Sequence, residues 1–267
     1  MAARPFRLIY TILLPALTLW VWLLVIATFS LRWFSIERPG PPVREIFPYG
    51  EMRVGVDASY APFAVATAEG LFGLDIDLAQ AIAARLGAPV RFVNMGFDGL
   101  YDSLKTDQVD VLISALVTDY SRTNEVLYTL PYYNAGLVLV SRANQPLTRY
   151  HDLRDQQLAL EFGSEADQIA RRWQRRTPMT ILPYELPSYA LDSLRLQQAQ
   201  AALVESTSAR LYRREHPTWN VLFTPMTDSL YLLATRRDRG QTWEAINRAL
   251  AELLDDGTIE ALIAKWL

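Results

Sequence analysis

The residues best placed to contact a small molecule follow an expected strand near residue 54. The stretch VGVDASYAPF, residues 54–63, begins with apolar residues and then places Asp57 and Tyr60 beyond the strand. In an α/β sheet the carboxyl ends of the strands face the ligand crevice, so a carboxylate and an aromatic ring there can meet a ligand. Phe63, three residues after Tyr60, is interpreted as part of the core.

Residues that would carry catalysis or hold a metal are few. The chain has no cysteines, and its two histidines, His151 and His216, lie far apart in the sequence. A histidine-based triad or a metal site would need further members beside them. Asp75 and Asp77 open an expected helix, where carboxylates cap free N–H groups. We therefore expect no cofactor and no metal, and we do not expect an enzyme.

Composition narrows the class of protein. The 267 residues are 51% apolar with a net charge of -3, which is enough apolar material for a sizeable core. The isoelectric point near 5.5 leaves no basic field to hold a nucleic acid. We therefore exclude nucleic-acid partners.

The N-terminus carries a long apolar run. Residues 8–31 contain no charge, and at roughly 1.5 Å rise per residue they can cross a hydrocarbon core of roughly 30 Å. A cleaved signal peptide is the alternative, but its apolar region is shorter and no clean cleavage site follows. We predict a transmembrane anchor over residues 1–34, followed by a proline-rich linker over residues 35–50.

Beyond the linker, strands and helices alternate in two blocks. In the first block we expect strands at 52–57, 89–95 and 109–116. We also expect a helix at about 75–86 that ends at Gly87. The second block repeats this order from residue 136, and a helix pair closes the chain. This βαβ order predicts two α/β lobes around a ligand cleft, lobe 1 over 51–138 plus 229–267 and lobe 2 over 139–228.

Several stretches in this order resemble one known family. VGVDASYAPF, LFGLDIDLAQAIAARLG, GFDGLYDSLKTDQVDVLISAL, SRTNEVLYTLPYY and LAELLDDGTIEALIAKWL follow its sequence of motifs. The chain is similar over residues 52–267 to the amino-acid class of bacterial extracellular solute-binding proteins, family 3. The resemblance implies the two-lobed type II periplasmic-binding-protein-like fold, a ligand bound by lobe closure and delivery to the permease of an ABC importer.

The resemblance also implies roles in lobe 1. Tyr60 and Phe97 would be aromatic walls around the ligand, and Asp57 would sense its far end. Arg122 would take the α-carboxylate of an amino acid through two parallel N–H bonds. Ser114 and Ala115 would lie in the same strand end. Val117 departs from the family, which has a Ser or Thr there, so one carboxylate contact is missing.

In lobe 2 the resemblance implies an acidic site. Glu205 stands where the family keeps an acidic residue for the ligand's ammonium group, and Glu161 stands where the family varies residues to select the side chain. Ser164 and Glu165 lie on a turn at a helix N-terminus, which we expect Glu165 to fill with its own charge. Asp57, Glu161, Glu165 and Glu205 outnumber Arg122, so we predict a cationic amino acid or related amine.

The family's extracytoplasmic location orients the anchor. We expect a single-pass protein of the cell membrane with a cytoplasmic N-terminus and a monomeric binding module outside. Two alternatives stay open: a membrane-anchored sensing module, and an enzyme similar to cyclohexadienyl dehydratases. Turnover of prephenate or arogenate would identify the latter.

Overall fold

The computed structural model describes Trp20 and residues 42–267. Within this part, Val43–Leu267 forms one compact unit. The membrane helix expected at residues 8–31 lies, apart from Trp20, outside the described residues. Among the residues that the structure describes, no helix is long and apolar enough to cross a membrane.

The first lobe is built on a five-stranded sheet with the order β5-β1-β6-β13-β7. Its strands are β1 (Met52–Val56), β5 (Val90–Asn94), β6 (Val111–Leu116), β7 (Val126–Asn134) and β13 (Leu230–Arg236). β1 pairs in parallel with β5 and β6, whereas β13 runs antiparallel to β6 and β7. Every residue of β1 is buried, as expected for a central strand covered on both faces.

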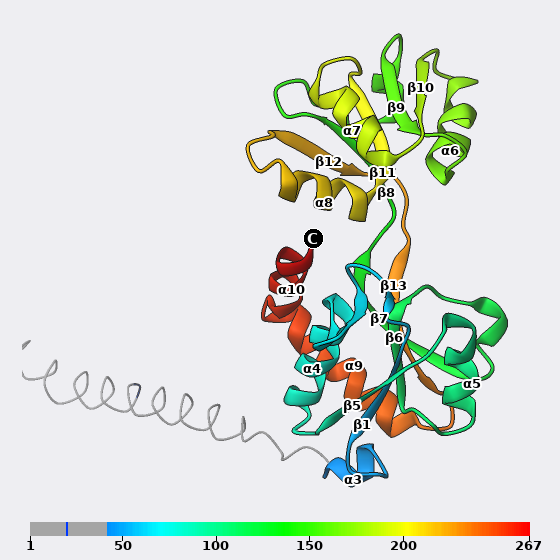
Figure 1. The fold of residues 1–267 in the computed structure, drawn as a ribbon, viewed down its shortest axis with the longest axis vertical. Helices are drawn as coiled ribbons and strands as arrows, with labels where there is room; N and C mark the ends of the chain where they lie inside the picture. Colours follow the sequence, from blue (N-terminus) through cyan, green and yellow to red (C-terminus); the bar gives the residue numbers. More distant parts are fainter. Residues whose placement is uncertain (1–19, 21–41) are drawn as a thin grey trace, which may run out of the picture. The chain divides into compact units, whose positions relative to one another are not determined.

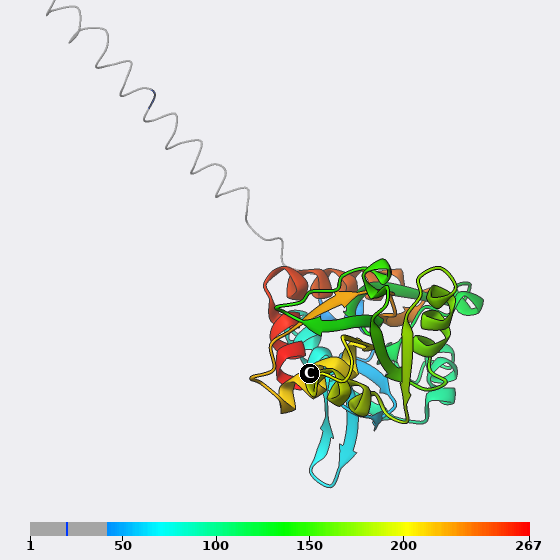
Figure 2. The ribbon, with the colours of Figure 1, turned by 90° about the horizontal axis from the view of Figure 1, so that it is seen from above.

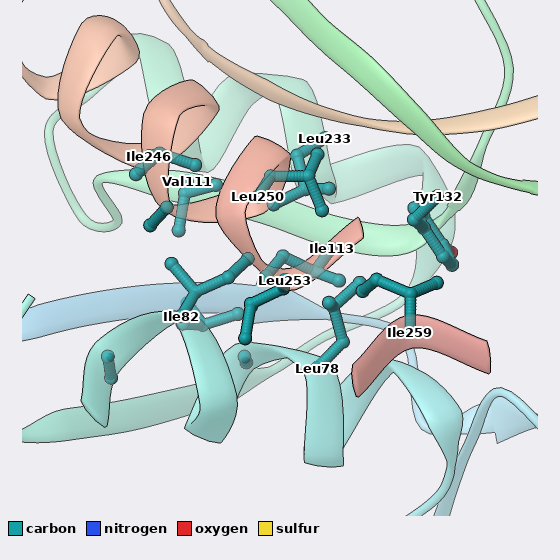
Figure 3. Close-up of a cluster of buried hydrophobic side chains, with 14 of the residues drawn as sticks. Leu78, Ile82, Val111, Ile113, Tyr132, Leu233, Ile246, Leu250, Leu253 and Ile259 are labelled. Atoms are coloured by element: carbon teal, nitrogen blue, oxygen red, sulfur yellow. The ribbon is translucent and has the colours of Figure 1, made fainter. Parts of the chain in front are cut away.

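Helices enclose this sheet and build its core. They are α4 (Leu74–Arg85), α5 (Leu100–Lys105), α9 (Gly240–Asp255) and α10 (Thr258–Trp266). Figure 3 shows Leu78 and Ile82 of α4 facing Leu250 and Leu253 of α9, with β6 beside them. Gly87, with φ of 64°, follows the end of α4 as predicted, because glycine adopts this left-handed conformation without strain.

The second lobe has its own five-stranded sheet, in the order β10-β9-β11-β8-β12. Its elements are β8 (Leu137–Arg142), β9 (Gln157–Glu161), α6 (Glu165–Gln174), β10 (Thr180–Tyr184), α7 (Pro187–Arg195), β11 (Ala201–Glu205), α8 (Ser206–Glu215) and β12 (Val221–Pro225). One apolar cluster packs α6 against the sheet, and a second packs α7 and α8. The two α/β sheets agree with the predicted architecture.

The chain passes between the two sheets twice. β7 leads into β8, and β12 leads back into β13, as the green and orange segments of Figure 1 show. The two passages approach closely at Gly136, where a Cβ would lie 2.1 Å from the carbonyl oxygen of Thr227. Only glycine therefore fits at this point of the first passage.

Two parts of the first lobe differ from the sequence expectations. Residues 59–72 form three short strands, β2 (Ser59–Tyr60), β3 (Ala64–Thr67) and β4 (Gly70–Phe72), whose blue-cyan hairpin extends from the lobe in Figure 2. The end of the predicted proline-rich linker instead forms α3 (Val43–Ile46), and Phe47 is fully buried in the first lobe's core. Burial of these apolar side chains outweighs the extended preference of the preceding prolines.

Candidate functional site

Asp57 joins three segments at the carboxyl end of β1. Its Oδ1 accepts a hydrogen bond from the Ser59 N–H at 3.1 Å, and its Oδ2 accepts one from the Phe97 N–H at 3.0 Å. Its own N–H donates to Ser114 Oγ, also at 3.1 Å. Both carboxylate oxygens of this half-buried residue thus hold backbone N–H groups. Asp57 and Ser114 fix the loop on which Phe97 stands.

The two aromatic residues predicted to contact the ligand are both accessible. Tyr60 is 46% exposed and Phe97 is 52% exposed. Tyr60 stacks on Phe63 with ring centroids 5.4 Å apart, and Phe63 is buried against Tyr133 and Tyr231. The buried ring of Phe63 therefore supports Tyr60 from behind and leaves its other side free.

A depression of about 520 Å³ opens beside the carboxyl end of β6. It is lined by Phe97, Tyr101, Leu116, Val117, Thr118, Asp119, Tyr120 and Ser121. Val117, at 48% exposed, presents an aliphatic side chain to it. Phe97 and Val117, both candidate ligand contacts, thus line one depression, whose lining is largely apolar.

Arg122 lies at the end of the short helix η3 (Tyr120–Arg122), next to this depression. Its Nε donates to Asp119 Oδ2 at 3.2 Å, and its guanidinium lies 4.4 Å from the centre of the Tyr101 ring. Within residues 42–267 its two terminal nitrogens make no hydrogen bond, and the side chain is 38% exposed. The end of the guanidinium is therefore available to a ligand.

Ala115 has an unusual backbone conformation, with φ of 46°. Its N–H donates to Asp75 Oδ2 at 2.8 Å, while the hydroxyl of Tyr132 donates to Asp75 Oδ1 at 2.6 Å. Burial raises the pKa of the Asp75 carboxyl to about 6, against the lowering effect of these hydrogen bonds. The prediction that Asp75 caps its helix is therefore wrong, because α4 has no side-chain cap and the Asp75 carboxylate instead holds the bend in β6 at Ala115. Asp77 does not cap α4 either, since its Oδ2 accepts hydrogen bonds from Lys265 and Trp266.

Three glutamates converge at the carboxyl ends of neighbouring parallel strands in lobe 2. Glu161 ends β9, Glu205 ends β11, and Glu165 begins α6. Burial raises the pKa of Glu205, and repulsion from Glu161 and then Glu165 raises it further. A cation bound among these carboxylates would relieve that repulsion.

The turn before α6 corrects one prediction. Ser164 caps the helix by accepting a hydrogen bond from the Asp167 N–H at 3.3 Å, and Asp167 Oδ2 accepts one from the Gly163 N–H at 3.1 Å. Glu165 remains exposed. The expectation that Glu165 fills this turn is wrong, because the nearly buried carboxylate of Asp167 occupies it.

Three residues of this region were not predicted. Tyr101 and Asp119 flank the Arg122 guanidinium, and Asp119 could have been recognised from its position three residues before an arginine. The third residue is Tyr231 on β13. Burial is the largest cause that raises its pKa, and the Tyr60 hydroxyl and the charge of Glu205 raise it further. No local signal in the sequence indicates that Tyr231 lies near residues of both lobes.

Comparison with known proteins gives a consistent result. The family model described as bacterial extracellular solute-binding proteins, family 3, matches residues 52–267. ABC transporter arginine-binding protein 1 of Escherichia coli (strain K12) is 26% identical, covering 81% of this chain and 90% of the relative. The L-cystine-binding protein TcyJ of the same strain is also 26% identical and covers 91% of both chains.

Solved structures extend the likeness. An ancestral cationic amino acid solute binding protein has a TM-score of 0.62 at 28% identity, covering 85% of this chain and 99% of that chain. The unliganded L-cystine solute receptor of Neisseria gonorrhoeae has a TM-score of 0.72 at 22% identity, covering 85% and 97%. The second likeness concerns the fold alone, and it supports the two-lobed α/β architecture.

Proposed function

Because the chain belongs to the bacterial extracellular solute-binding proteins of family 3, we propose that it captures an amino acid or related amine and delivers it to an ABC importer. The lobes would close on the ligand, since candidate contacts come from both. The names of the curated relatives are those of binding proteins, which favours this function over sensing or dehydration.

The observation that carries the proposal is the distribution of charge at the strand ends. Lobe 1 offers the end of the Arg122 guanidinium, and lobe 2 offers the carboxylates of Glu161, Glu165 and Glu205. A guanidinium suits the carboxylate of an amino acid, and clustered carboxylates suit its cationic groups. A cationic ligand would compensate the charges that burial disfavours. The names of the arginine-binding relatives support the same ligand class.

The proposal includes a membrane anchor. Residues 8–31 carry no charge, which supports a single-pass helix. The extracellular function of the family supports a cytoplasmic N-terminus, with a binding module outside that we propose to be monomeric. Extraction of membranes with alkaline carbonate should leave the full chain in the pellet, and protease added to spheroplasts should digest the module. Release of the chain by carbonate would contradict the anchor.

A thermal-shift screen of the full chain tests the ligand. The panel holds the common amino acids, ornithine, diamines and prephenate. A ligand at 100 times its dissociation constant adds about 2.7 kcal/mol to the free energy of unfolding. We expect arginine, lysine or ornithine to raise the melting temperature, and Glu205→Gln to weaken their binding by about tenfold or more. Glu215→Gln, at the far end of α8, is the control.

Two results would contradict the proposal. Stabilisation only by acidic or purely apolar amino acids would exclude a cationic ligand. Conversion of prephenate would make the protein an enzyme.

A further inference from the structure

The guanidinium of Arg122 already has an anionic partner within its own segment. Asp119 Oδ2 lies 3.2 Å from Arg122 Nε. The pair is therefore close to neutral as a unit before any ligand arrives. A ligand carboxylate approaching the free end of Arg122 would meet the repulsion of Asp119 as well as the attraction of the guanidinium.

Asp119 cannot easily turn away from this position. Its Oδ1 accepts hydrogen bonds from the N–H of Ser121 at 2.9 Å and from the Ser121 hydroxyl at 2.6 Å. Its own N–H donates to the Tyr128 hydroxyl at 3.1 Å. These bonds, and those to Arg122, lower the pKa of the Asp119 carboxyl, so it is ionised at neutral pH.

Within the described residues, the depression beside the pair contributes no positive charge. The depression beside Arg122 is lined by aromatic, aliphatic and hydroxyl side chains, and its one charged lining residue is Asp119. Val117 offers no hydroxyl that could donate to a carboxylate. Lobe 2 contributes the carboxylates of Glu161, Glu165 and Glu205. The charges thus favour the cationic groups of a ligand far more than its carboxylate.

We infer that Asp119 is a specificity-determining residue that offsets the charge of Arg122, so that the site selects a cationic amine for which an α-carboxylate adds little affinity. This inference rests on the proposed function of the same site. Most of the binding energy then comes from the ligand's cationic groups and lobe 2. Arginine and its decarboxylated analogue, agmatine, should bind with similar strength.

Calorimetry of the full chain tests this with two pairs of ligands that differ only in the carboxylate. The pairs are arginine with agmatine and lysine with cadaverine. For the wild type we expect the dissociation constants within each pair to agree within about tenfold. Asp119→Asn should strengthen arginine and lysine binding by about tenfold, because removing the charge frees Arg122, and should leave agmatine unchanged.

Two further variants separate charge from structure. Asparagine keeps the cap to the Ser121 N–H, since its side-chain oxygen accepts the same bond. Adding Arg122→Ala to Asp119→Asn should abolish the gain. Asp192→Asn is the matched control, because Asp192 pairs with Arg195 at the same spacing and similar exposure, at 2.8 Å. It should leave all four affinities unchanged.

The failures are distinguishable. If the wild type binds arginine more than about a hundredfold tighter than agmatine, the proposed function stands and this inference is overturned. An unchanged arginine-to-agmatine ratio in Asp119→Asn would also overturn it. If none of the four ligands binds, the proposed cationic ligand and this inference fall together.

Discussion

Asp75 and Glu205, among the described residues, have raised pKa values, and burial is the largest cause for both. Asp75 is fully buried and bonded within lobe 1, and desolvation dominates its shift. Glu205 is raised by burial and by two neighbouring glutamates. The first shift therefore concerns the stability of the fold, whereas the second concerns the affinity for a cation.

Ligand affinity should depend on pH through Glu205. A cationic ligand favours ionised Glu205, so affinity should weaken as the pH falls through the raised pKa of this group. Binding should release protons, which calorimetry in two buffers of different ionisation enthalpy detects. Glu205→Gln should flatten the pH dependence above the ordinary pKa of a glutamate. The same slope in this variant would mean that another group titrates.

Stability should depend on pH through Asp75 in the opposite sense to most paired carboxylates. Its pKa rises from 3.8 to about 6 on folding, so the native state binds this proton more tightly than the unfolded state. The free energy of unfolding should thus fall as the pH rises from about 4 to about 6, by about 3 kcal/mol in total. Asp75→Asn keeps hydrogen-bonding groups for Ala115 and Tyr132 but does not titrate.

The measurement compares urea unfolding of the wild type and Asp75→Asn at a series of pH values. The difference between the two should change across that pH window. A constant difference would contradict a raised pKa in the fold. Asp98→Asn, on the exposed helix η2 (Phe97–Gly99), controls for general charge effects.

At the scale of elements, the passage between β7 and β8 depends on one glycine. A Cβ at Gly136 would lie 2.1 Å from the Thr227 carbonyl oxygen and 3.0 Å from Asn134 Oδ1. Gly136→Ala should therefore force the two passages apart and lower the free energy of unfolding by about 1–3 kcal/mol. It should also change ligand affinity, because these passages are the links between the lobes.

Gly240→Ala is the matched control for this substitution. Gly240 is the first residue of α9, and a Cβ there meets nothing within 4 Å. Alanine should be neutral or stabilising by up to about 1 kcal/mol. Equal effects of the two substitutions in urea unfolding would show that the close approach at Gly136 carries no cost.

The parallel strands and long helices could be predicted from the sequence because their apolar periods are strong. The short exposed strands β2 to β4 could not, since they bury little and follow no period over their few residues. α8 was missed because it begins directly after the buried strand β11, without a break. In the candidate site, the polar and aromatic residues that follow the strands could be predicted from the sequence. The stacking of Tyr101 on Arg122 could not, because it depends on tertiary packing.

At the scale of the whole molecule, each lobe has a core of its own. Phe47 is buried in the core of lobe 1, although it lies within the predicted proline-rich linker. Leu203 of β11 is buried in a separate cluster in lobe 2. The cores are connected through two backbone passages, so partial independence in unfolding is expected.

Two core truncations should therefore act on different transitions in scanning calorimetry. Phe47→Ala should cost about 3–5 kcal/mol and lower the melting temperature of lobe 1, while Leu203→Ala should cost about 2–5 kcal/mol and lower that of lobe 2. A bound ligand should raise both transitions, since the proposed contacts come from both lobes. If either substitution instead shifts one common transition, the lobes unfold as a single cooperative unit, and the links through Gly136 transmit stability as well as motion.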